Sequence, residues 1–119
     1  AYDNEVKIKI LGVRRETLEK YKSVSYETGE EMAEGVRKAL DADLGLSETG
    51  IAGPGSGSSA KGVGLFYIGL SSKQGNCVKE YIFRGDRLEN KKSAAEAALT
   101  MLKGYLLELK GTEGGSSSI

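Results

Sequence analysis

The segment from Thr49 to Gly64 combines the residue types that bind anions. It holds six of the chain's 17 glycines and its only proline. Glycine permits positive φ and lets backbone N–H groups approach a ligand, while Pro54 fixes one φ angle. Hydroxyls from Thr49 and the loop serines, together with the amine of Lys61, add donors for a phosphate or a sugar. These features favour an anion-binding loop at a strand end, although a flexible linker could have the same composition.

Two common nucleotide-binding motifs are excluded. The loop lacks Gly-Lys-Ser/Thr at the spacing of a Walker A motif, and a predicted strand follows it where a Rossmann fingerprint requires a helix. The chain has no histidine, which excludes imidazole catalysis and histidine-ligated metal sites within it. We therefore expect neither a metal ion nor a cofactor.

Composition limits the partners and the compartment. Lys plus Arg and Asp plus Glu both number 17, giving a formal net charge of zero, which weighs against nucleic acid as a partner. No apolar run approaches the ~18 residues of a membrane span. The single cysteine, Cys77, cannot form an intrachain disulfide and fits a reducing, cytoplasmic location. We expect it to be a small core residue.

Two helices should position the loop. Small and apolar residues recur at helical spacing from Ser25 to Leu40, and Ser25 is a natural N-cap. Asp86 and Glu89 have capping-box spacing at the start of a second helix, which Gly111 should end. The apolar residues predicted to mark one face of this second helix are Leu88, Ala95, Leu99, Leu102, Leu106 and Leu109.

Three strands are predicted between these helices, at Leu44 to Thr49, Val63 to Leu70 and Cys77 to Phe83. The second is apolar almost throughout, as expected of a strand covered on both faces. A short polar connection joins the second and third strands, which predicts an antiparallel hairpin. This order of elements indicates a mixed sheet with helices packed on it.

The opening residues are ambiguous. Val6 to Ile10 alternates apolar and polar residues, which favours a strand, but Val6, Ile10 and Leu11 also fit one face of a helix. The length of 119 residues corresponds to one domain. We place this domain at residues 1–110 and expect a flexible tail over residues 111–119.

The sequence from Thr49 to Pro54 (TGIAGP), followed by a Gly/Ser loop, resembles the signature of the CinA C-terminal domain family. Further stretches are similar to the family in the expected order, namely residues 1–7 with 11–13, 24–25 with 32–35, and 83–87. Two positions depart from the family's pattern: Glu48 stands where an apolar residue is usual, and Gly62 where proline is usual. Glu48 could alter substrate preference or pair with a nearby lysine.

The resemblance implies a fold and an activity. The fold would be an α/β one with three layers, α/β/α, and a mixed, mostly parallel sheet of about five strands in the complete domain. It makes residues 3–11 helical. Family members hydrolyse the amide of nicotinamide mononucleotide to nicotinate mononucleotide and ammonia in pyridine nucleotide salvage, and are commonly homodimers. A small nucleotide is therefore the expected ligand.

Site residues follow from the matching motifs. Lys7 would be the general base of a Ser–Lys mechanism, with Tyr2 as a proton-relay or orienting partner. The backbones of Gly50, Ala52, Gly53 and Gly55 would bind the nucleotide, Thr49 would offer a hydroxyl, and Arg87 would bind the 5′-phosphate. These last six residues are the expected substrate-binding set.

The family's nucleophilic serine lies in an N-terminal segment with a Ser-Cys-Thr-Gly-Gly motif, and nothing in this chain matches that segment. We therefore expect a domain that is incomplete at its N-terminus and inactive by itself, with the absent segment supplied by the rest of a longer product or by a separate piece. The alternative is a non-catalytic nucleotide-binding or regulatory module. A competence factor that binds DNA is a weaker alternative because of the zero net charge.

Overall fold

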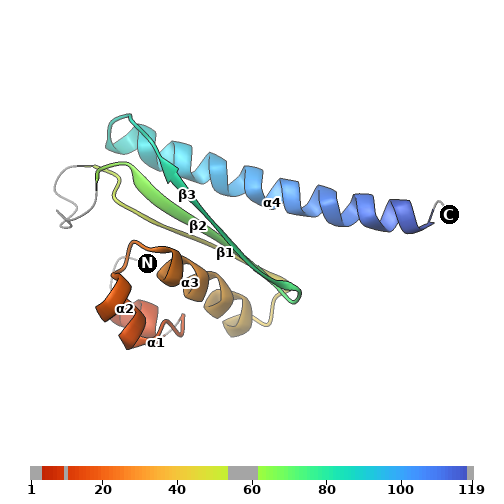
Figure 1. Cartoon of the computed structure of the whole chain (residues 1–119), viewed down its shortest axis with the longest axis horizontal. Coiled ribbons are helices and arrows are strands. Elements are labelled where there is room, and N and C mark those ends of the chain that lie inside the picture. The colour runs from red at the N-terminus through yellow and green to blue at the C-terminus, as the bar shows by residue number, and fades with distance from the viewer. Residues whose placement is uncertain (1–3, 10, 54–61, 118–119) are drawn as a thin grey trace.

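The structure is a computed structural model that describes residues 4–9, 11–53 and 62–117. Its elements follow one another as α1 (Asn4–Lys9), α2 (Arg15–Tyr21), α3 (Tyr26–Ala39), β1 (Leu44–Gly50), β2 (Leu65–Ser72), β3 (Gly75–Ile82) and α4 (Arg87–Ser117). The strands form a sheet with α1, α2 and α3 on one side and α4 on the other (Figure 1). The predicted α/β class and the helices on both faces are therefore confirmed.

The sheet has the order β1-β2-β3, and both pairings are antiparallel. Parallel neighbours need a long crossover connection, usually a helix, and no helix separates β1, β2 and β3 in the described residues. The hairpin of β2 and β3 is confirmed, with Ser72 opposite Gly75. The prediction of a mixed, mostly parallel sheet of about five strands is not confirmed, because the three described strands are antiparallel.

Alternate residues of the strands face different helical layers. Ile68 and Leu70 of β2 pack with Ala98 and Met101 of α4, whereas Tyr67 packs on the α3 side. Burial of Ile68 is complete, which contributes about 1.5–3 kcal/mol relative to an exposed side chain. The central strand is covered on both faces, as its apolar sequence predicts. Cys77, predicted to be a core residue, is exposed on the edge strand β3 instead.

Both predicted helix starts are confirmed by their caps. Ser25 Oγ accepts a hydrogen bond from Thr28 N at 3.1 Å. At the start of α4, Asp86 Oδ1 accepts from Glu89 N at 2.8 Å, and Glu89 Oε1 accepts from Asp86 N at 2.9 Å. This reciprocal pair is a capping box, and it fixes where Arg87 enters the helix.

The far part of α4 differs from the prediction. The helix continues to Ser117 instead of ending at Gly111, since glycine within a helix costs only about 1 kcal/mol. The domain boundary at residue 110 and the flexibility of the tail stay predictions. Small residues, Ala94 and Ala98, face the sheet, while the predicted leucine face is largely exposed, with Leu99 at 63%.

The N-terminal layer settles the ambiguous opening. Residues 4–9 are helical as α1, as the family resemblance implies, and not a strand. The short helix α2 was not predicted, because its N-cap Arg14 makes no side-chain cap hydrogen bond. Val13, Leu18 and Met32 form the core between these helices and α3. None of the helices in the described residues is both long and apolar enough to cross a membrane.

We predict that Gly35→Ala lowers the stability of the protein although alanine favours helix formation. A Cβ at position 35 of α3 would lie against the backbone carbonyl of Leu11, so the α1–α2 layer must move, at a cost of about 1–3 kcal/mol. Gly29→Ala, in the same helix, is the control, since its Cβ would make ordinary contacts at 3.6 Å. Urea unfolding compares the two variants, and equal stability would contradict this packing.

Candidate functional site

A cavity of about 600 Å³ lies along β1 and at its C-terminal end. Helices α1 and α3 line it from one side of the sheet, and the first turn of α4 lines it from the other. The residues with polar or charged side chains that matter most for its chemistry are Lys7, Ser23, Glu48, Thr49, Arg87 and Lys91. Lys7, Thr49, Gly50, Ala52 and Arg87, predicted from separate parts of the sequence, therefore line one cavity.

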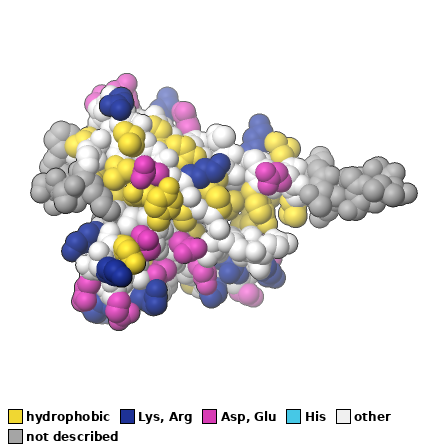
Figure 2. All heavy atoms as spheres, viewed as in Figure 1, with side chains coloured by type: hydrophobic (Ala, Val, Ile, Leu, Met, Phe, Trp, Pro, Cys, Tyr) yellow, Lys and Arg dark blue, Asp and Glu magenta, His cyan; other side chains and the backbone are white. Residues whose placement is uncertain are grey.

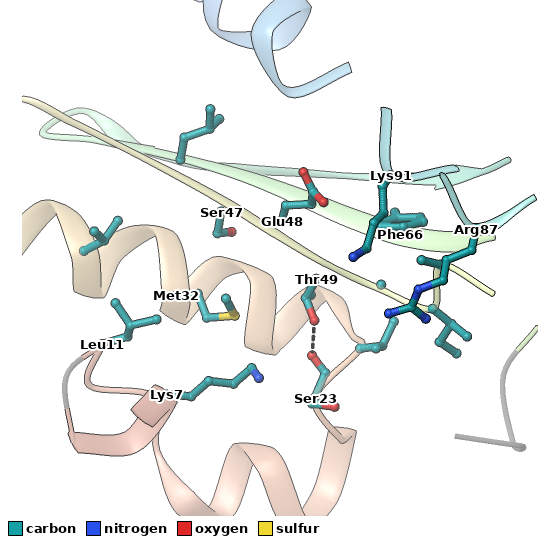
Figure 3. Close-up of a pocket in the computed structure, with 16 residues that line it drawn as sticks. Lys7, Leu11, Ser23, Met32, Ser47, Glu48, Thr49, Phe66, Arg87 and Lys91 are labelled. Carbon is teal, nitrogen blue, oxygen red and sulfur yellow. Dashed lines mark hydrogen bonds between the residues drawn. The ribbon is translucent and has the colours of Figure 1, made fainter. Parts of the chain in front are cut away.

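Strand alternation divides the cavity into two halves. Odd-numbered residues of β1 face α3, as Ser47 shows by donating from its Oγ to Gly29 O at 2.7 Å. Even-numbered residues face α4, as Leu46 shows by packing against the cluster of Ala98 and Met101, so Glu48 lies on the same side as Lys91 (Figure 3). Lys7 approaches from the α3 side. Lys7, the predicted base, and Arg87, predicted to bind the phosphate, thus come from helices on opposite sides of the sheet, and both line the cavity.

Lys7 is the most deeply buried charged residue of the site, at 3% exposed. Helix α1 is held in place because Val13 N donates to the carbonyl of Lys7 at 2.9 Å. In Figure 3 the amine of Lys7 points toward the end of β1, where Ser23 and Thr49 meet. A lysine in this position is shielded from bulk water, which is the environment that a lysine base requires.

Thr49 has a structural contact in addition to its predicted role, which stays a prediction. Its hydroxyl donates to the backbone carbonyl of Ser23 at 2.7 Å, and the residue is 8% exposed. The single hydroxyl proton is committed to this bond, so Thr49 can only accept a hydrogen bond from a ligand. Its main effect is to hold the segment before α3 beside the end of β1.

Gly50 and Gly53 are required for close packing, and neither has a positive φ. A Cβ at Gly50 would lie against the ring of Phe66, and a Cβ at Gly53 would lie 2.8 Å from the Cβ of Arg87. The second contact brings the segment after β1 directly beside the first turn of α4. The prediction that these residues bind a nucleotide through their backbone stays a prediction, but the glycine requirement has this additional cause.

Asn90 joins these parts and was not predicted from the sequence. Its side chain is 1% exposed. Its Nδ2 donates to the carbonyls of Ala52 at 2.9 Å and Gly85 at 3.0 Å, while its Oδ1 accepts from Gly85 N at 2.9 Å. One side chain therefore fixes α4, the turn before it and the segment after β1. The sequence shows only an asparagine four places after the cap Asp86, and its burial could not be predicted from that position.

Two charged residues of the cavity were not predicted as site residues. Lys91 follows Arg87 by one helical turn, so both lie on the same face of α4. Glu48 has an exposed side chain, but desolvation by the surrounding chain raises its pKa, while the positive charge of Lys91 acts in the opposite direction. The cavity thus has two cations and one carboxylate on its α4 side.

Tyr2 and Gly55, the other predicted site residues, lie outside the described residues. Within the described part of the chain, no group of three or more acidic or cysteine side chains could hold a metal ion. A second cavity, of about 670 Å³, lies between the loop after α1 and helix α3, and it contains none of the predicted site residues. The cavity at β1 is therefore the candidate site.

Comparison with known proteins identifies relatives over most of this chain. The model of the CinA C-terminal domain matches residues 1–106. A relative from Thermoanaerobacter sp. (strain X514) is 49% identical over 110 residues, and the CinA-like protein of Kosmotoga olearia is 48% identical over 109 residues. Each alignment covers 92% of this chain, but only 27% and 26% of the relatives. The chain thus spans about a quarter of their length.

Solved structures agree with this match. The competence/damage inducible protein CihA of Agrobacterium tumefaciens has a TM-score of 0.82 and 35% identity, covering 87% of this chain and 64% of that one. The competence or damage-inducible protein of Enterobacter asburiae has a TM-score of 0.82 and 32% identity, covering 87% and 65%. This chain therefore spans slightly less than two thirds of these solved chains.

We predict that Asn90→Ala destabilises the protein by about 1–3 kcal/mol, because it leaves buried backbone groups of Ala52 and Gly85 without partners. Lys92→Ala is the control, because Lys92 is exposed on the same helix. Thermal or urea unfolding measures both. If Asn90→Ala unfolded like the control, the hydrogen bonds of Asn90 would not hold the site together.

Proposed function

We propose that this chain, which belongs to the CinA C-terminal domain family, forms part of an amidohydrolase. The enzyme converts nicotinamide mononucleotide and water to nicotinate mononucleotide and ammonia. The observation that carries the proposal is the single cavity onto which both the buried amine of Lys7 and the guanidinium of Arg87 open. The cavity volume of about 600 Å³ lies within the ordinary range for small-molecule sites.

Hydrolysis of an amide requires a nucleophile, a base that activates it and donors for the developing oxyanion. The nucleophile attacks the amide carbon, ammonia leaves, and water then releases the carboxylate from the resulting acyl ester. In this scheme the neutral amine of Lys7 takes the proton from a serine hydroxyl. This step requires Lys7 to be uncharged part of the time. The ammonium that results can then give a proton to the departing amine.

The other parts of the cavity bind the nucleotide in this proposal. Arg87 lies in the first turn of α4, where backbone N–H groups also favour an anion, and it pairs with the 5′-phosphate. The backbone from Gly50 to Gly53 contacts the ribose. The phosphate and the reacting amide are then held at opposite ends of the cavity. Tyr2 keeps its role as an orienting partner of Lys7.

The nucleophilic serine comes from polypeptide outside this chain, and the free edge of β1 offers a place for that polypeptide. Ile51 N donates to Leu65 O at 2.9 Å and Ile51 O accepts from Gly64 N at 2.6 Å, so both backbone groups of Ile51 point toward the chain of β2. Backbone groups alternate in direction along such a strand. Those of Leu46, Glu48 and Gly50 therefore point to the free edge, where no strand of the described residues pairs.

The surface beside this edge also supports an additional segment. Figure 2 shows hydrophobic side chains gathered between α4 and the layer of α1, α2 and α3. Leu99 and Leu106 of α4 are 63% and 47% exposed. Exposed apolar surface of this kind is typical of a contact site. Association of two copies, as in other members of the family, stays a prediction.

A direct assay separates this proposal from a non-catalytic nucleotide-binding module. We expect the longer polypeptide, in which relatives carry this region, to release ammonia from nicotinamide mononucleotide. Residues 1–119 by themselves should release none, because they lack the serine segment. Binding without any turnover by the longer polypeptide would favour the regulatory module.

We predict that Arg87→Ala weakens binding of nicotinamide mononucleotide by about 1.5–3 kcal/mol, the range for charge-assisted hydrogen bonds. Binding of the unphosphorylated riboside should barely change. Arg84→Ala is the matched control, because Arg84 is exposed and does not line the cavity. Calorimetry with both ligands measures the effect, and equal losses for nucleotide and riboside would rule out a phosphate contact.

In the longer polypeptide, Lys7→Ala should lower kcat by about 10²–10⁴-fold, the effect of losing a general base. Lys7→Arg should be nearly as damaging, because a guanidinium is not deprotonated at neutral pH. Lys9→Arg on the same helix is the control, since Lys9 is exposed. Substrate binding should persist in all three variants. Wild-type turnover by Lys7→Arg would show that Lys7 is not the base.

A further inference from the structure

The α4 half of the cavity presents a set of charges that the proposed contact between Arg87 and phosphate does not use. Lys91 lies one helical turn after Arg87 and lines the same cavity. Glu48 extends toward α4 from the neighbouring strand β1, and Figure 3 shows its carboxylate and the amine of Lys91 on the same side of that strand. Two cations and one anion therefore line the cavity beside the segment that follows β1.

The arrangement of α4 makes this set specific. The buried amide of Asn90 ties the start of the helix to Ala52, and Gly53 lies directly beside Arg87. The direction of Arg87 and Lys91 is thus fixed by the fold. The next basic residue, Lys92, is exposed and does not line the cavity. Of the three basic residues between positions 87 and 92, Arg87 and Lys91 therefore line the cavity.

Electrostatics also links Glu48 to Lys91. Desolvation raises the pKa of the Glu48 carboxyl, and the charge of Lys91 acts in the opposite direction. An anion that binds near Lys91 is therefore attracted by the ammonium of Lys91 and repelled by the carboxylate of Glu48.

We propose that Lys91 is a second phosphate-binding residue and that Glu48 sets its affinity by competing with the phosphate for the charge of Lys91. The inference deepens the proposed function, on which it rests for the identity of the nucleotide, and it names the ligand group as a phosphate monoester. A dianionic monoester needs more than one cation for full neutralisation, and Arg87 supplies only one. Glu48 therefore acts as a positioning and specificity residue and makes no contact with the reacting amide.

The test uses ribose 5-phosphate and ribose as probes, with affinities for this chain measured by calorimetry. Lys91→Met should weaken binding of ribose 5-phosphate about tenfold or more, as expected for a charge-assisted bond, and Lys92→Met should leave it unchanged. Glu48→Gln should strengthen that binding about two- to fivefold, the range of a partly exposed charge interaction. Glu96→Gln, an exposed carboxylate outside the cavity, is the control for Glu48.

A double variant separates competition from a structural effect. If Glu48 acts through Lys91, then Glu48→Gln should have no effect on phosphate affinity when Lys91 is already Met. Unchanged binding in Lys91→Met, or an equal gain from Glu48→Gln in both backgrounds, would overturn the proposal. If ribose 5-phosphate binding depends on Lys91 while the longer polypeptide fails to hydrolyse nicotinamide mononucleotide, the proposed reaction fails and this phosphate site stands.

Discussion

The candidate site depends on the hydrogen bonds of Asn90. This one buried amide connects α4 to the carbonyl of Ala52 after β1 and to both backbone groups of Gly85 before the helix. Each such bond contributes only about 0.5–1.5 kcal/mol to stability, but a buried backbone group without a partner costs more. The segment after β1 therefore cannot move away from α4 without losing the bond from Asn90 to Ala52. Arg87 is held beside Gly53 as a consequence.

The second constraint is the alternation of β1. Neighbouring side chains of a strand point to opposite faces, so Thr49 faces Lys7 and α3 while Glu48 faces Lys91 and α4. A ligand bound across the end of this strand would contact the buried amine of Lys7 on one side and the cations Arg87 and Lys91 on the other. This arrangement suits a nucleotide whose amide and phosphate are at opposite ends. The chemistry of the site is thus distributed by the geometry of a single edge strand.

Much of this arrangement could be predicted because its causes are local. The caps at Ser25 and Asp86 and the hairpin of β2 and β3 follow from short sequence patterns, and the structure confirms them. The helical opening needed the family resemblance, since Val6 to Ile10 alternates like a strand. Whether the leucines of α4 or its alanines face the sheet depends on how closely the helix approaches it, which no local pattern specifies.

The site was predicted less completely, because its geometry depends on contacts between distant segments. Lys7, Gly50 and Arg87 line one cavity and Gly53 lies beside Arg87, while the hydroxyl proton of Thr49 is already donated to Ser23. Asn90 and Lys91 were not expected in the site, and Glu48 was noted only as a departure from the family's pattern. The most direct test of the account is an amide chemical-shift titration of this chain with nicotinamide mononucleotide. The account predicts the largest shifts at residues 50–53 and 87–91; shifts confined to residues 30–39, beside the second cavity, or none at saturation would contradict it.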